Sequence, residues 1–211
     1  AALGDTINLT TEVTGTLPIA NGGTNSTATA FVNAASNVTG TLPTANGGTG
    51  GTSYSPGISE ADQWRVTSSF TGDADPIASN WERNDTDFDK IGTGMSESSG
   101  IFTFASTGIY KIDFGGVSWH TGQDRWHNWH IQATTNDSSW SLISGTGDSG
   151  VYTESSVSQY NSAISTVIFD VTSVSTHKVR FRIDANDGSS TTEGSSTYQY
   201  CGATFIRLGD T

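Results

Sequence analysis

The larger, C-terminal part of the chain is a series of short segments in which apolar and polar residues alternate. In one of them, Tyr110, Ile112 and Phe114 alternate with Lys111 and Asp113. Alternation with a period of two puts apolar side chains on one face of a β-strand. Related segments, separated by turns rich in Gly, Ser and Asp, are 63–70, 101–104, 125–134, 163–171, 179–183 and 198–208. The pattern predicts an all-β fold, an antiparallel sandwich, and no window has a sustained helical period.

The N-terminal part contains a repeat instead. The twelve residues Val13–Thr24 recur as Val38–Thr49, 25 residues later, with eleven identical positions. Each unit has only a few apolar side chains, which is too few for a core of its own given the entropy lost on ordering the chain. We predict an extended β or irregular shaft in which several chains share these side chains around one axis. A disordered Gly/Ser/Thr linker is the alternative.

Composition and charge change sharply at the turn-forming triplet Ser55-Pro56-Gly57. Residues 1–57 contain only two charged residues, Asp5 and Glu12. Residues 58–211 contain all nine Lys and Arg against nineteen Asp and Glu, so they carry −10 of the total net charge of −12. We therefore predict two domains, a repeat shaft over 1–57 and a knob over 58–211. The acid excess argues against nucleic acid as a partner.

Two motifs resemble known families. The repeat Val-Thr-Gly-Thr-Leu-Pro-x-Ala-Asn-Gly-Gly-Thr resembles the repeat of bacteriophage tail fibres. Gly100–Phe104 followed by Gly108–Ile112 is similar to the Gly-x-Phe…Gly-x-Tyr-x-Phe stretch of C1q/TNF-like jelly rolls, although Ile112 stands where that pattern has Phe. Ala203–Leu208 lies where that fold has its last core strand. The resemblances imply a distal tail-fibre fragment, homotrimeric, with a C-terminal jelly-roll head.

The resemblance to tail fibres also implies a function. It implies a virion protein, not an enzyme, that attaches to a host glycan or outer-membrane receptor and joins other tail proteins on its N-terminal side. Synthesis in the host cytoplasm agrees with a single cysteine, Cys201, which cannot form an internal disulfide. One alternative is a structural trimerisation or capping module without a receptor site. Another is a polysaccharide depolymerase using Asp113, Asp124 or Asp137, whose spacing identifies no acid–base pair.

A group of aromatic and polar residues is the best candidate site. This aromatic–histidine cluster consists of Trp119, Arg125, Trp126, Asn128 and His130. An exposed indole beside amide, guanidinium and imidazole groups suits a sugar, which needs a surface for stacking and planar hydrogen-bonding partners. The alternative interpretation is that these aromatic residues fill the sandwich core and the trimer interface.

Strand register decides which of these side chains reach the surface. A four-residue turn between the two strands predicts a hairpin with Trp119 opposite Trp126. In this register every member of the cluster except Arg125 shares the outward face, whereas Trp129 and Ile131 point into the core. Arg125 reaches the same face only around the hairpin tip. A slip of one residue would exchange the two faces.

Two further motifs resemble known sites only in part. Asp85, Asp87 and Asp89 are spaced like the start of a calcium loop, but Lys90 stands where an EF-hand has its glycine. They form either an irregular calcium site or a solvated acidic turn, and we expect no other cofactor. The segment 145–150 fits Gly-x-Gly-x-x-Gly and contains Gly-Asp-Ser-Gly. No helix or suitably placed histidine accompanies it, so it predicts a turn.

Overall fold

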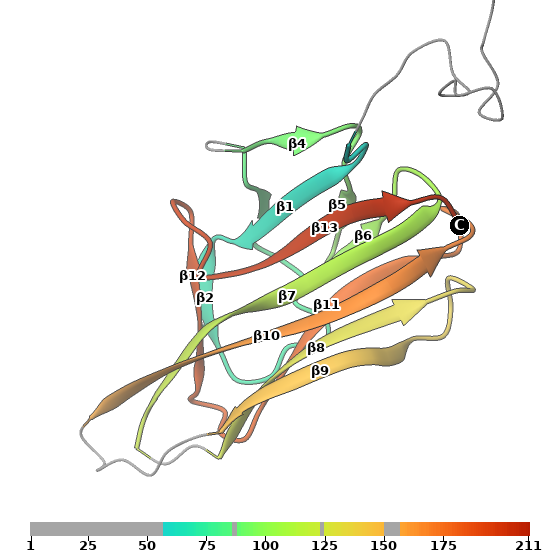
Figure 1. Cartoon of the computed structure of the whole chain (residues 1–211). Helices are drawn as coiled ribbons and strands as arrows, with labels where there is room; N and C mark the ends of the chain where they lie inside the picture. The colour runs from blue at the N-terminus through green and yellow to red at the C-terminus, as the bar shows by residue number, and fades with distance from the viewer. Residues whose placement is uncertain (1–56, 86–87, 123–124, 150–156) are drawn as a thin grey trace, which may run out of the picture. The chain divides into compact units, whose positions relative to one another are not determined.

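The described part of the protein is two antiparallel β-sheets packed face to face (Figure 1). The computed structural model describes residues 57–85, 88–122, 125–149 and 157–211. These residues contain no helix, and so none that could cross a membrane. The repeat shaft predicted over 1–57 lies outside the described residues except for Gly57. The predicted all-β antiparallel class is confirmed.

The two sheets differ in size. We call the eight-stranded sheet A and the five-stranded sheet B. Sheet A consists of β1 (Ala61–Val66), β2 (Ser68–Thr71), β3 (Trp81–Arg83), β4 (Lys90–Ile91), β7 (Gly108–Thr121), β10 (Ser158–Val171), β12 (Thr191–Ser195) and β13 (Cys201–Gly209). Sheet B consists of β5 (Ser96–Ser98), β6 (Ile101–Thr103), β8 (Trp126–Thr134), β9 (Ser141–Ser149) and β11 (Lys178–Ala185).

The long strand β7 organises sheet A. One edge of β7 pairs with β10 along its whole length, and the other edge is shared by β13 and β12. Beyond β13 lies β1, whose other edge pairs with β3 and β4, while β2 lies beyond β12. The order in sheet B is β5-β6-β11-β8-β9. Most partners are distant in sequence, as in the pairing of β1 with β13.

An aromatic core lies between the sheets. Phe114 of β7 and Phe205 of β13 come from sheet A, and Phe102 of β6 and Phe181 of β11 come from sheet B; all four are buried. The rings of Phe114 and Phe181 stack with centroids 4.5 Å apart, and Phe102 is 5.3 Å from Phe181. Such pairs are favourable beyond the area they bury. The apolar faces predicted from the alternation of Tyr110, Ile112 and Phe114 and of segment 179–183 belong to this core.

One side of the sandwich is closed by side-chain bonds to backbone carbonyls. The Ser165 hydroxyl of β10 donates to the carbonyl oxygen of Trp129 at 2.5 Å, and the Ser144 hydroxyl of β9 donates to that of Thr166 at 3.0 Å. The edge strand of sheet A thus lies along β8 and β9 of sheet B, as Figure 1 shows. The outer faces of the two sheets remain as broad surfaces for a ligand or another subunit.

Candidate functional site

The structure separates the aromatic–histidine cluster between the two sheets. Trp119 lies on β7 in sheet A and pairs with Tyr160 of β10, with ring centroids 6.2 Å apart. Trp126 lies on β8 in sheet B and pairs with Ser149 of β9. The predicted pairing of Trp119 with Trp126 is therefore wrong, because the chain crosses from one sheet to the other between β7 and β8. Arg125 is exposed just before β8.

The faces of β8 itself are as predicted. Trp129 and Ile131 are fully buried in the core. Trp126 is 40% exposed, and Asn128 and His130 are partly exposed on the opposite face of the strand. Three members of the cluster therefore remain together on the outside of sheet B, without Trp119.

Two residues of β11 lie beside them. Asp184 pairs with Asn128, and Arg182 pairs with His130, across the β8–β11 ladder. We use the name sheet B face for Trp126, Asn128, His130, Arg182 and Asp184. The two β11 residues were missed as site residues because the sequence shows the alternation of each strand but not which strands are neighbours.

The other neighbour of β8 presents glycines to this face. Gly147 and Gly145 of β9 lie opposite Asn128 and His130. A Cβ atom at Gly147 would lie 2.3 Å from Oδ1 of Asn128, and one at Gly145 would lie 2.7 Å from Cδ2 of His130. The turn predicted over 145–150 is therefore wrong where the structure describes it. The segment is a strand whose glycines leave room for side chains of the adjacent strand.

The positive charges on this side of sheet B are compensated by carboxylates. A guanidinium nitrogen of Arg182 is 3.7 Å from Asp184 and another is 3.6 Å from Asp75. Arg180 is 3.2 Å from Asp75, and its guanidinium lies over the Trp140 ring at 4.5 Å. The surface is consequently polar and rich in hydrogen-bonding groups without a free cluster of positive charge.

Burial, followed by repulsion from Arg182, lowers the pKa of His130; Asp184 and Asp75 act in the opposite direction. We expect an NMR titration to place the pKa of His130 below the ordinary value of 6.5. Replacing Arg182 by Gln should raise that pKa only in part, since burial is the larger cause. A His130 that titrates at or above 6.5 in the native protein would contradict this assignment.

The same shift has a consequence for stability. The unfolded chain takes up a proton at His130 near pH 6.5, whereas the folded chain resists it. The stability associated with neutral His130 is therefore complete above pH 6.5 and is lost as the pH falls from there through the lowered pKa.

The predicted calcium ligands are only partly described. Asp85 lies in a turn and is exposed, and Asp87 lies outside the described residues. The carboxylate of Asp89 is 3.8 Å from Nζ of Lys90. Among the residues that the structure describes, no three His, Cys, Asp or Glu are grouped so that they could hold a metal ion. The calcium site stays a prediction.

The acids predicted for a depolymerase lie on different segments of the fold. Asp113 is on β7 in sheet A and accepts a hydrogen bond from the Thr166 hydroxyl at 2.7 Å. Asp137 follows β8 of sheet B and forms an ion pair with Lys178 at 2.6 Å. Asp124 lies outside the described residues. Asp113 therefore belongs to sheet A and Asp137 to the loop after β8, and each carboxylate bonds to a different neighbour.

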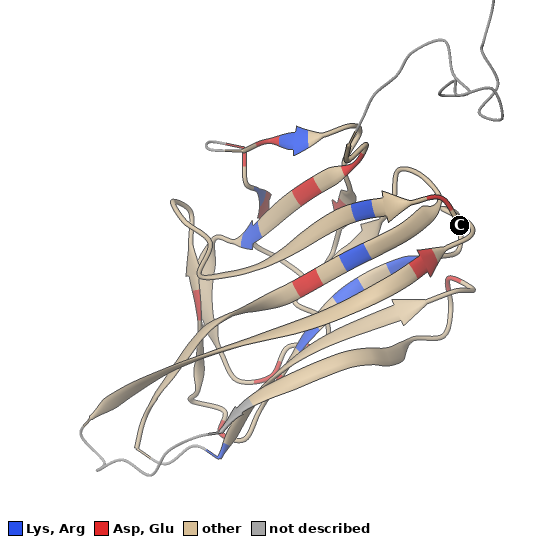
Figure 2. Ribbon diagram, in the orientation of Figure 1, with Lys and Arg blue, Asp and Glu red and all other residues tan. Residues whose placement is uncertain are grey.

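The outer face of sheet A presents several large apolar side chains beside one ion pair of β7, Lys111 with Asp113. Along β10, Tyr160, Ile164 and Ile168 are 63%, 67% and 65% exposed, and Tyr200 beside β13 is 42% exposed. We use the name sheet A face for these four residues. Figure 2 shows that β10 carries no Lys or Arg, and its only acidic residue, Asp170, lies near its end. A sheet that faces water normally alternates apolar and polar residues, so this face is typical of a surface that another molecule covers.

A groove of about 800 Å³ lies on this side of sheet A. Its lining includes Ile164, Tyr200 and the glycines Gly115, Gly116 and Gly202. A Cβ atom at Gly116 would lie 2.1 Å from the carbonyl oxygen of Tyr200, so the close approach of the backbones requires glycine there. The sequence contains a signal of this surface, because Ile164 and Ile168 stand at the polar positions of the alternation in 163–171.

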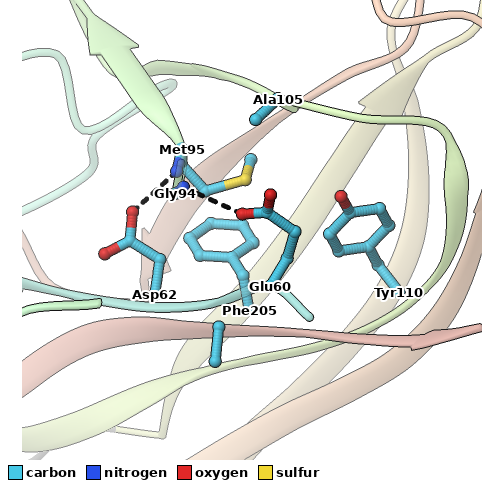
Figure 3. Close-up of a pocket in the computed structure, with 8 residues that line it drawn as sticks. Glu60, Asp62, Gly94, Met95, Ala105, Tyr110 and Phe205 are labelled. Atoms are coloured by element: carbon cyan, nitrogen blue, oxygen red, sulfur yellow. Dashed lines mark hydrogen bonds between the residues drawn. The ribbon is translucent and has the colours of Figure 1, made fainter. Parts of the chain in front are cut away.

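A second, very small cavity is structural (Figure 3). It measures about 10 Å³, room for one water molecule at most, and lies between Tyr110 and the carboxylates of Glu60 and Asp62. The backbone N–H groups of Gly94 and Met95 donate to these carboxylates at 2.9 Å and 2.7 Å. These bonds tie the loop before β5 to β1 and leave no space for a ligand.

Cys201 is fully buried, and burial raises the pKa of its thiol. The thiol therefore stays protonated at neutral pH and is a packing residue of β13.

Comparison with known proteins defines the fold class. No family model matches the chain, and no curated protein matches it. Among solved structures, Eiger TNF from S. frugiperda is similar with a TM-score of 0.53 at 12% identity, over 72% of this chain and 93% of that one. Murine APRIL at pH 5.0 is similar with a TM-score of 0.51 at 13% identity, over 71% and 98%. The described residues thus form a TNF-like jelly roll, and the predicted C1q/TNF-like fold is confirmed.

Proposed function

We propose that this chain is the distal part of a bacteriophage tail fibre, a virion protein whose trimeric C-terminal head attaches to a host cell surface. One observation carries the proposal: a duplicated repeat of the tail-fibre type is followed in the same chain by a TNF-like jelly roll. The repeat shaft occupies 1–57 and joins other tail proteins on its N-terminal side. Synthesis takes place in the host cytoplasm, with which an inert buried thiol at Cys201 is compatible.

The sheet A face supports the trimer. Four large, exposed apolar or aromatic side chains and an open groove would be costly to leave in water. A second copy of the chain is the occupant that the proposal assigns, because the repeat also needs partner chains to bury its apolar residues. Covering the sheet A face leaves the sheet B face as the accessible surface for a receptor.

Trp126→Ala is expected to weaken attachment about tenfold per head, because it removes the exposed ring on which a sugar would stack. The measurement is binding of the fluorescently labelled whole chain to a panel of Gram-negative strains. Light scattering must show the same oligomer for the variant as for the original chain. The matched control is Phe88→Ala, which removes a ring that is 45% exposed between β3 and β4 of sheet A, away from β8 and β11.

Two outcomes would contradict receptor binding at this surface. Unchanged attachment by Trp126→Ala would place the receptor site elsewhere on the head. A trimer that binds no strain of the panel would favour the alternative function, a structural trimerisation or capping module, which the sheet A face by itself also supports. New reducing ends in surface polysaccharide incubated with the chain would instead indicate a depolymerase.

A further inference from the structure

We propose that the sheet B face binds an uncharged saccharide, with hydroxyl groups bonded to Asn128 and Asp184 and a sugar ring stacked on Trp126. This inference rests on the proposed attachment function and specifies the class of its ligand. It also differs from the cluster inferred from sequence, because it excludes Trp119 and adds two residues of β11.

The backbone register brings the required groups together. Asn128 is two residues from Trp126 on the same face of β8, and Asp184 is directly across the ladder from Asn128. An amide offers both a donor and an acceptor, and a carboxylate offers two acceptors, so neighbouring sugar hydroxyls can each find a partner. The exposed indole beside them supplies an apolar platform of the size of a sugar ring.

The glycines of β9 leave the space that the polar side chains of β8 occupy. The Oδ1 atom of Asn128 occupies the space in which a side chain at Gly147 would begin, at 2.3 Å from the would-be Cβ. His130 occupies the same kind of space above Gly145. Glycine at both positions therefore lets these side chains lean across β9, and that strand adds no side chain of its own opposite them.

Charge selects an uncharged ligand over an acidic one. Arg182 of this face and the neighbouring Arg180 are already within 4 Å of Asp75 or Asp184. Arg125, exposed just before Trp126, is the one further described arginine at this end of β8. His130, with its lowered pKa, adds no positive charge at neutral pH. Residues 58–211 carry a net charge of −10, which repels an anion before contact. A ligand without charge avoids both the repulsion and the cost of separating these ion pairs.

The test is an array of neutral and acidic oligosaccharides, the latter containing sialic or uronic acids, probed with the labelled whole chain. We expect the neutral set to bind, with little change on raising the salt concentration. Gly147→Ala should weaken that binding about tenfold, since the methyl group displaces the Asn128 amide. Asn128→Ala should do the same if the glycine variant folds poorly. Gly188→Ala is the matched control, because a Cβ there meets nothing within 4 Å.

The outcomes separate this inference from the attachment function. Binding only to acidic sugars, or neutral binding that survives both Gly147→Ala and Asn128→Ala, would overturn the inference. Attachment to cells accompanied by no binding to neutral sugars would also overturn it, while the proposed attachment function would stand. Loss of neutral binding in both variants, with attachment to cells lost in parallel, would support both.

Discussion

Ile164→Asp is expected to turn the proposed trimer into a monomer without unfolding the head. Ile164 is 67% exposed on β10 and lines the groove of sheet A, so the fold of a single chain does not depend on it. In an assembly that covers the sheet A face, the new carboxylate would be buried in a groove where Lys111 is already paired with Asp113, at a cost of several kcal/mol per subunit. Light scattering of the whole chain measures the mass, and circular dichroism checks that the β-structure is retained.

Leu142→Asp is the matched control for this experiment. Leu142 is 57% exposed on β9, so the same change is made at a similarly exposed residue of the other sheet. The control should keep the mass of the original chain. If Ile164→Asp keeps that mass too, the sheet A face is not the subunit contact. If the original chain is itself a monomer, the trimeric architecture is wrong.

Asp62→Ala is expected to lower the free energy of unfolding by about 3–5 kcal/mol, the range for breaking a buried ion pair. Asp62 is 1% exposed and lies on β1. Its carboxylate accepts hydrogen bonds from Nε1 of Trp64 at 2.9 Å, from the backbone N–H of Met95 at 2.7 Å and from Nε of Arg83 at 3.0 Å. Without the carboxylate these donors lose their acceptor in a place that water reaches poorly.

Urea denaturation measures this loss of stability. The protein concentration is kept the same for both chains, because association of the chains also shifts the midpoint. Asp210→Ala is the control. Its side chain is 91% exposed and paired with Arg207, so its removal should leave the midpoint unchanged. A loss below about 1 kcal/mol for Asp62→Ala would mean that the carboxylate does not hold this corner of the head together.

Asp62 and Ile164 lie beside two different kinds of cavity. The cavity beside Asp62 measures only about 10 Å³, and hydrogen bonds at its wall join Glu60 and Asp62 to the loop before β5. The groove beside Ile164 is open, and its lining combines apolar side chains and glycines with the Lys111–Asp113 ion pair. The first is a feature of folding, and the second is the surface that we assign to another subunit.

The faces of individual strands could be read from the sequence. Trp129 and Ile131 are buried and Trp126 is exposed because successive side chains of a strand point to opposite sides, a geometry that depends only on neighbouring residues. The same local rule assigned Tyr110, Ile112 and Phe114 to the core. The all-β class and the jelly-roll head followed from such patterns and from short motifs.

Only the tertiary structure decided which strands are neighbours. β7 and β8 are consecutive, yet they lie in different sheets, so Trp119 meets Tyr160 instead of Trp126. Asp184 reaches Asn128 although 56 residues separate them in the sequence. Gly145 and Gly147 predict a turn from sequence alone, whereas in the structure they lie in a strand, and the side chains of His130 and Asn128 occupy the space above them. Pairing is set by contacts between distant segments, about which the period of a single strand contains no information.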